Sequence, residues 1–336
     1  MAEPDRSTSE NRICRNDATD RGEPTNRDEP TIREPNIEHE GKLEKTGGTP
    51  PRMLCWNARG LVNKDTKWKV DAIKEHAIVN NVVIMNFTET WLNREIQDEK
   101  IPNFTTFRSD RKCSKKIKGG GAAIYVKNGF ESRLISADQI GSCEIVAINI
   151  ENINTTNIVV YRPPDTCYKE FERVMNKIEL LLSMMESPEP TVIITGDFNF
   201  PFIEWKRNEE GACAWKKKTL DNGSVDDQKQ FSKMMEIMNK YHLVQTVEEK
   251  TRKNNTLDLV FTNNMGIITQ IDVTGTIMSD HDIIELTTNI GDNDRKIENN
   301  ENKEQTEKDL RQLNFHHEKV DWTMWRIPKK RKKEWK

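Results

Sequence analysis

Short runs of aliphatic and aromatic residues, rich in β-branched side chains, recur through the middle of this 336-residue chain. Buried strands have this pattern, because such side chains suit a pleated sheet surface and polar turns separate the strands. The runs span residues 82–87, 122–126, 145–150, 158–161, 192–195, 257–261 and 283–287, and segments with helical spacing span 66–80, 168–185 and 228–241. Because strands outnumber helices, we expect packed sheets flanked by helices and not a simple doubly wound sheet.

The two ends of the chain differ in composition from the middle. Residues 1–51 are mainly Asp, Glu, Arg, Asn, Thr and Pro, and residues 291–308 return to Asn, Asp, Glu and Lys. Segments with so few apolar residues cannot offset the entropy lost on ordering, and the mean hydropathy of −0.82 agrees with an incompletely folded chain. We therefore expect a disordered arm at 1–51, a folded domain at 52–290 and a polar linker at 291–336.

Charge and cysteine content narrow the class of protein. The chain has 52 Lys and Arg residues against 55 Asp and Glu residues, a net charge of −3, so any charge that binds nucleic acid must be local. The six cysteines include no C-x-x-C pair that would suggest a zinc site, and we interpret them as reduced thiols. No apolar stretch has transmembrane length and the N-terminus has no signal-peptide core, so we expect an intracellular protein of the nucleus or cytoplasm.

Polar clusters follow the ends of several predicted strands, where α/β proteins present side chains to ligands. The side chains concerned are those of Asn57, Glu89, Tyr161, Asp197, Asn199, Asp280 and His281, and Asp258 begins a further predicted strand. Together they offer oxygen ligands, a phenol, amides and one imidazole, and hard oxygen ligands suit Mg²⁺ or Mn²⁺. A divalent cation with a histidine held by a carboxylate forms a site suited to phosphodiester hydrolysis.

These motifs resemble those of the endonuclease/exonuclease/phosphatase superfamily, which includes apurinic endonucleases, DNase I and inositol phosphatases. They occur in family order between about residues 53 and 286: a Trp-Asn pair, a Glu after a strand, a Tyr followed by Pro, Gly-Asp-Phe-Asn, a late Asp, and Ser-Asp-His. One such motif alone would be weak evidence, whereas six in order are specific. The resemblance implies a four-layer α/β sandwich of the DNase I type, with two facing mixed sheets flanked by helices.

The resemblance implies a metal site for Mg²⁺, with Mn²⁺ as the alternative. Glu89 would be the main metal carboxylate, with Asn57 beside it and Asp280 contributing directly or through water. Apurinic endonucleases carry a second acidic residue two positions after the Asn, where this chain has Arg59. The site then has fewer carboxylates, which implies a modest affinity for Mg²⁺.

The resemblance also implies the residues that handle the phosphate and the protons. Asp197 would activate the attacking water or serve the leaving group, and Asn199 and Tyr161 would hold the phosphate. His281, oriented by Asp258, would bind the scissile phosphate or shuttle a proton.

Other features resemble the endonucleases of non-LTR retrotransposons in particular. They are the glycine-rich residues 119–121 before a strand, the extended motif at 161–164, and residues 313–315 and 320–322, which resemble the linker before a reverse transcriptase. We therefore expect a Mg²⁺-dependent endonuclease that cuts DNA and leaves a 3′-hydroxyl, with a reverse transcriptase domain as partner in a longer polyprotein. Two alternatives stay open: a phosphoesterase of the same fold acting on a non-DNA substrate, and a catalytically silent DNA-binding relic of a mobile element.

Several surface features have two interpretations each. A group of basic side chains could solvate a loop or grip DNA phosphates, and these are Arg108, Arg111, Lys115, Lys116 and Lys118. Trp205 and Trp215 could stack on bases or cover a hydrophobic surface, and we favour the second. Residues 119–121 could be merely a flexible turn. The basic run at 329–333 could be a solvated linker or a patch for nuclear import or DNA contact.

Overall fold

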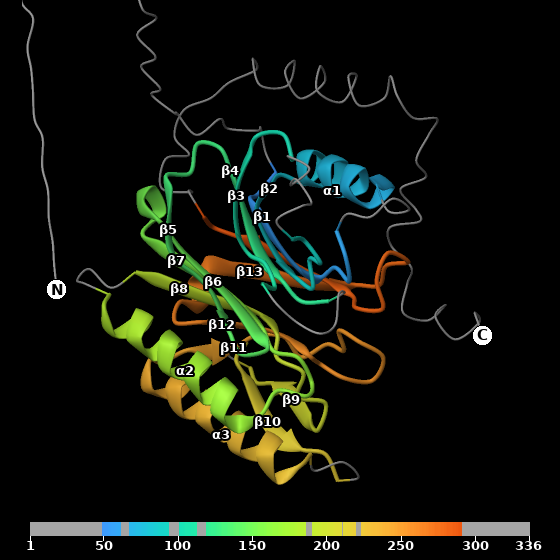
Figure 1. Ribbon diagram of the computed structural model, residues 1–336. Helices are drawn as coiled ribbons and strands as arrows, with labels where there is room; N and C mark the ends of the chain where they lie inside the picture. Colours follow the sequence, from blue (N-terminus) through green and yellow to red (C-terminus); the bar gives the residue numbers. More distant parts are fainter. Residues whose placement is uncertain are drawn as a thin grey trace, which may run out of the picture. The chain divides into compact units, whose positions relative to one another are not determined.

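The computed structural model describes residues 49–61, 67–93, 101–112, 119–185, 190–209, 211–219 and 223–290 (Figure 1). Nearly all of the predicted N-terminal arm, the whole 291–336 linker and its basic run lie outside these residues, so the proposed domain boundaries stay a prediction. No helix in the described part of the chain is both long and apolar enough to cross a membrane.

Two six-stranded sheets form the centre of the domain. In spatial order the first contains β13 (Ile268–Thr274), β14 (Ile283–Thr288), β1 (Arg52–Asn57), β2 (Val82–Thr88), β4 (Ala122–Lys127) and β3 (Phe104–Ser109). The second contains β11 (Val244–Gln245), β12 (Asp258–Thr262), β8 (Thr191–Asp197), β7 (Thr155–Tyr161), β6 (Cys143–Ile150) and β5 (Ser132–Ile140). Each sheet is mixed, because β1 and β2 are parallel, as are β7 and β8, whereas the other neighbours are antiparallel.

Helices cover the outer faces of both sheets (Figure 1). They are α1 (Lys67–Val79) on the first sheet and α2 (Tyr168–Ser183) with α3 (Val225–Lys240) on the second. A short hairpin, β9 (Ile203–Arg207) with β10 (Cys213–Lys217), and two 3-10 helices, η1 (Glu151–Ile153) and η2 (Met265–Ile267), complete the described elements.

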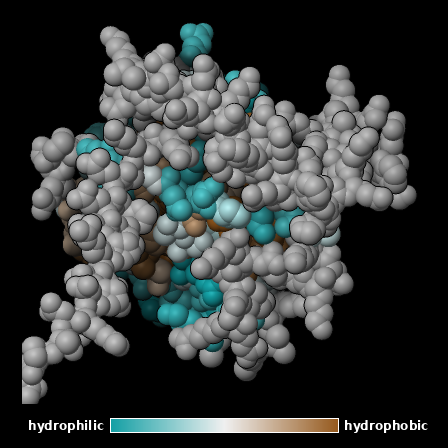
Figure 2. Space-filling model, turned by 90° about the horizontal axis from the view of Figure 1, so that it is seen from above, coloured by the Kyte–Doolittle hydropathy of each residue, from teal (hydrophilic) through white to brown (hydrophobic). Residues whose placement is uncertain are grey.

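The alternation of side chains along each strand builds four layers. On β1, Met53 and Cys55 pack between the two sheets, whereas Leu54 and Trp56 pack in the cluster that includes the buried face of α1. The expected four-layer α/β sandwich with two facing mixed sheets is therefore confirmed. In the view from above, hydrophilic residues form several patches on the coloured surface, and hydrophobic ones lie mainly toward its left (Figure 2).

The three predicted helices are confirmed to within a few residues. The strands outside the seven predicted runs are β1, β3, β5, β9, β10, β11 and β13. β1 is almost wholly buried, and most of the others have several partly or fully exposed residues. Half-exposed strands carry polar residues that dilute the apolar pattern, which explains why the sequence did not reveal them. Trp205 on β9 is 2% exposed and packs edge-to-face on Phe231 and Phe261, so its predicted covering role is confirmed.

Candidate active site

The predicted site residues gather at one edge of both sheets. Asn57, Tyr161 and Asp197 are the last residues of the parallel strands β1, β7 and β8, and Glu89 directly follows β2. Parallel strands in one sheet end at the same edge, so their terminal side chains become neighbours. In the second sheet, Asp197 is the register partner of both Tyr161 and Asp258, so all three lie in one row.

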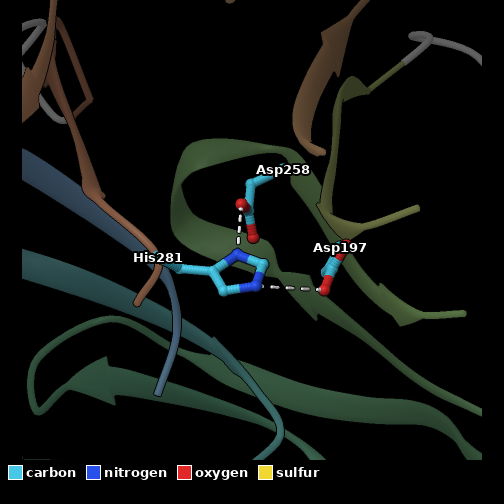
Figure 3. Close-up of side chains that lie close together, drawn as sticks. All are labelled: Asp197, Asp258 and His281. Carbon is cyan, nitrogen blue, oxygen red and sulfur yellow. Dashed lines mark hydrogen bonds and ion pairs between the residues drawn. The ribbon is translucent and has the colours of Figure 1, made fainter. Parts of the chain in front are cut away.

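Asp197, Asp258 and His281 form a buried group between the ends of the sheets. Figure 3 shows the His281 ring between the two carboxylates, with Nδ1 2.7 Å from Asp258 Oδ2 and Nε2 3.9 Å from Asp197 Oδ2. All three residues are at most 3% exposed. The bond to Asp258 fixes the orientation of the imidazole, so Nε2 is the ring nitrogen directed at Asp197.

Hydrogen bonds from the first sheet hold this group in place. Asn57 Nδ2 donates to Asp197 Oδ2 at 2.8 Å, which links β1 to β8. Trp56 Nε1 donates to the carbonyl oxygen of His281 at 3.2 Å. Asp197 Oδ1 accepts from the backbone N–H of Asn199 at 3.1 Å, so the loop after β8 is hydrogen-bonded to the carboxylate at the end of that strand. These bonds come from different elements, which leaves the side chains little freedom.

The environment raises the pKa values of both Asp197 and His281. Burial, together with the Asp258 carboxylate, raises the pKa of Asp197 to about 7. Burial disfavours the charged imidazole, but Asp258 and Asp197 outweigh it and raise the pKa of His281 to about 9. At neutral pH the group therefore combines an imidazolium with a carboxyl that can gain or lose a proton.

Glu89 and Asp280 form a second cluster that is more exposed than the first. Glu89 Oε1 accepts a 2.6 Å hydrogen bond from Tyr161 Oη, and Glu89 Oε2 accepts from Trp91 Nε1 at 3.2 Å. Arg59 lies between the two acids, 2.7 Å from Asp280 Oδ2 and 3.9 Å from Glu89 Oε2. Their side chains are 17% and 33% exposed, so this cluster is open to solvent where the buried group is closed.

The ligand atoms that the Glu89 cluster offers fit a hard divalent cation. Two carboxylates supply oxygen ligands, and Asp280 Oδ1 is a buried oxygen without a hydrogen-bond partner. Arg59 and a second arginine, Arg252, donate to the other oxygen of Asp280; although burial acts in the opposite direction, they hold the pKa of Asp280 below its usual value. Asn57 Oδ1 accepts from the Arg59 backbone N–H at 3.2 Å, which keeps this amide beside the cluster.

The buried group offers another arrangement of ligand atoms. One atom each from Asp197, Asp258 and His281 lies within 4.8 Å of the others, a spacing that could hold a metal ion. However, the Nδ1 of His281 and an oxygen of Asp197 already have close hydrogen-bond partners. An imidazole between two carboxylates also has the chemistry to transfer protons.

Buried cations that the sequence analysis did not single out support the loops of the site. Lys69 Nζ donates to the carbonyl oxygens of Ala58 and Gly60 at 2.8 and 2.9 Å, and burial lowers its pKa to about 8. Arg162, fully buried, donates to Asp227 at 2.7 Å and to the carbonyls of Phe198 and Asn199. Arg162 belongs to the sequence motif at 161–164, but the motif gave no role to the arginine itself.

The predicted DNA-contacting residues fall in two groups. Lys115, Lys116 and Lys118 lie outside the described residues. Arg108 lies 3.3 Å from Asp110, and Arg111 donates to Glu144 instead of extending into solvent. Contact of this segment with DNA stays a prediction.

The comparison with protein families gives one match. Residues 155–285 match the family described as "Endonuclease-reverse transcriptase". This range contains Tyr161, Asp197, Asp258 and His281, and it confirms the resemblance stated from the sequence motifs. None of the curated proteins matches the chain significantly.

Solved structures share the fold at low sequence identity. An AP endonuclease from Archaeoglobus fulgidus is 12% identical, with a TM-score of 0.50, and the match covers 71% of this chain and 99% of that one. The endonuclease domain of TRAS1, a telomere-specific non-LTR retrotransposon, is 16% identical, with a TM-score of 0.46 over 72% of this chain and 100% of that one. A 3′ phosphatase, NExo from Neisseria, is 11% identical, with a TM-score of 0.49 over 70% and 98%. The first of these supports the DNase I-like fold.

Proposed function

We propose that this chain, which carries a domain of the endonuclease–reverse transcriptase type, is a divalent-metal-dependent endonuclease that hydrolyses DNA phosphodiesters and leaves a 3′-hydroxyl. The observation that carries the proposal is the buried Asp258–His281–Asp197 group beside the oxygen-rich Glu89 cluster. A polar group of this kind is expensive to bury, so its presence at a sheet edge points to chemistry.

The buried group would manage the protons of hydrolysis. Asp197, with its raised pKa, would accept the proton of the attacking water or serve the leaving oxygen. His281, positively charged at neutral pH and oriented by Asp258, would stabilise negative charge on the scissile phosphate or pass on a proton. Both roles use the positions that the hydrogen bonds from Asn57 and Trp56 fix.

The Glu89 cluster would hold the metal and orient the phosphate. Glu89, with Asp280 and Asn57, would bind Mg²⁺, or Mn²⁺ in its place, and the bound ion would neutralise charge on the phosphate and on the leaving oxygen. Burial, and to a smaller extent the neighbouring Glu89 carboxylate, raises the pKa of Tyr161, so its hydroxyl stays a hydrogen-bond donor across the physiological pH range. Asn199, anchored by donation to the Arg162 carbonyl at 2.8 Å, would contribute to phosphate binding.

Plasmid nicking tests the proposal. We expect the parent protein to convert supercoiled plasmid to the open circular form with Mg²⁺ but not with EDTA, and the nicks to prime extension by an added DNA polymerase. Extension without prior phosphatase treatment would establish the 3′-hydroxyl. A well-folded parent that does not nick, or that hydrolyses inositol phosphates instead, would contradict the proposal. The natural partners would be DNA and a reverse transcriptase domain.

A further inference from the structure

An ion pair behind the Glu89 cluster involves Arg111 and Glu144. Arg111 Nε and Nη2 donate to the two oxygens of Glu144 at 2.7 and 3.0 Å, and Nη2 also donates to the Ser142 carbonyl at 2.9 Å. The Glu144 side chain is 0% exposed and that of Arg111 is 14% exposed. Two-point pairing of this kind fixes the plane of a guanidinium as well as its position.

The pair stands directly beside Tyr161. Glu144 on β6 is the register partner of Tyr161 on β7, so the two side chains project from the same face of the second sheet. The Arg111 guanidinium lies 5.7 Å from the centre of the Tyr161 ring, within the range of a cation–π contact. The Tyr161 hydroxyl in turn donates to Glu89. An unbroken chain of contacts therefore runs from Glu144 through Arg111 and Tyr161 to Glu89.

The glycine-rich segment at 119–121 joins this assembly from the first sheet. Gly120 has a φ of +78°, and a Cβ atom there would lie 2.3 Å from Arg111 Cζ, so only glycine leaves room for the guanidinium. The Gly120 carbonyl accepts from Trp91 N at 3.0 Å, and the Gly121 carbonyl accepts from Thr90 N at 3.3 Å. The segment thus contacts Arg111 on one side and the residues after Glu89 on the other, which a merely flexible turn would not do.

A contribution to stability alone does not account for this arrangement. Replacing a buried ion pair with apolar residues of similar volume is often neutral or stabilising, so such a pair is weak evidence for a stabilising role. What apolar residues cannot provide is a fixed guanidinium plane against an aromatic ring. The position of that ring determines where the Tyr161 hydroxyl meets Glu89.

We propose that Arg111 and Glu144 are positioning residues, which orient the Tyr161 ring and through it the Glu89 carboxylate. The inference rests on the proposed function for its effect on catalysis, but the orientation of Tyr161 can be measured without any substrate. Neither residue contacts the Asp197, Asp258 and His281 group among the interactions described above.

The test replaces the pair without leaving a lone buried charge. The double variant Arg111→Met with Glu144→Gln removes both charges, and the matched control Arg52→Met with Glu285→Gln removes a largely buried pair elsewhere, joined at 3.0 Å. All proteins are labelled with 3-fluorotyrosine. The chain has four tyrosines, so the ¹⁹F spectrum is simple and Tyr161→Phe assigns the signal of interest.

We expect the Tyr161 signal to move in the Arg111 and Glu144 double variant and to stay in place in the control. The single-turnover rate of nicking should fall about 10-fold or more, as is usual when a residue that orients a direct ligand is replaced. In the Tyr161→Phe background, where the hydroxyl is absent, the same double variant should lose almost nothing further.

Two results would overturn the inference. One is a Tyr161 signal that keeps its position in the Arg111 and Glu144 double variant. The other is an equal loss of nicking in the parent and Tyr161→Phe backgrounds, which would show that the pair acts independently of Tyr161. If the parent does not nick DNA at all, the proposed function fails, and the ¹⁹F signal alone decides the positioning role.

Discussion

The buried group of Asp197, Asp258 and His281 and the Glu89 cluster differ in how they are built. Asp197 and Asp258 of the buried group lie at the ends of strands and the whole group is closed to solvent, whereas Glu89 and Asp280 lie outside the strands, are partly exposed and share an arginine. Glu89 even has a φ of +47°, a strained conformation for its type. A preorganised group suits proton transfer, and an open group suits an exchangeable ion, so the difference suggests a division of labour.

The largest expected effect comes from breaking the buried group. His281→Ala should lower the single-turnover rate of nicking by about 10²- to 10⁴-fold, the usual range for a general acid or base. His76→Asn is a matched control, because His76 is another buried histidine beside a carboxylate, 3.3 Å from Glu285. Similar losses in both variants would mean that the rate reports only the stability of the fold.

The His281 pKa predicts a pH-dependent contribution to stability. Because the folded pKa of about 9 lies above the unfolded value of about 6.5, the contribution is fully present below pH 6.5 and is lost as pH rises through 9. The free energy of unfolding of the parent, minus that of His281→Asn, should fall by on the order of 2–3 kcal/mol between pH 6 and 10. Denaturant unfolding measures this difference, and exposed His242→Asn provides the baseline. A pH-independent difference would contradict the proposed ion pair.

Metal binding should depend on the Glu89 cluster. With Mg²⁺ at about ten times its Kd, the parent should gain about 1.4 kcal/mol of stability, seen as a higher Tm. Glu89→Gln should abolish this gain, whereas Glu204→Gln on the surface strand β9 should keep it. A normal Mg²⁺-dependent rise in Tm for Glu89→Gln would place the ion elsewhere.

Arg59 should have the smallest effect, and its sign is informative. Its guanidinium lies near both acids, so Arg59→Gln should remove a repulsive charge and strengthen Mg²⁺ binding about fivefold. Isothermal titration with Mn²⁺ can measure the change, with the exposed Arg133→Gln as control. Weaker binding in Arg59→Gln would show that the arginine supports the ion and does not compete with it.

The sequence predicted those parts of the site that stand on strong local patterns. Asp197 and Tyr161 end apolar strands, and α2 carries six buried apolar residues on one face, so periodicity was sufficient there. Pairings such as Arg111 with Glu144 or Arg252 with Asp280 join residues 33 and 28 positions apart. Nothing in local spacing distinguishes such a buried charge from a solvated one, so only the three-dimensional arrangement reveals them.

The division of labour is tested most directly by the Mg²⁺ dependence of nicking in His281→Ala and Glu89→Gln. Our account predicts that His281→Ala lowers the maximal single-turnover rate and leaves the half-saturating Mg²⁺ concentration unchanged, whereas Glu89→Gln raises that concentration. If His281→Ala instead shifts the Mg²⁺ dependence and Glu89→Gln does not, the metal is held by Asp197, Asp258 and His281, and the central claim is wrong.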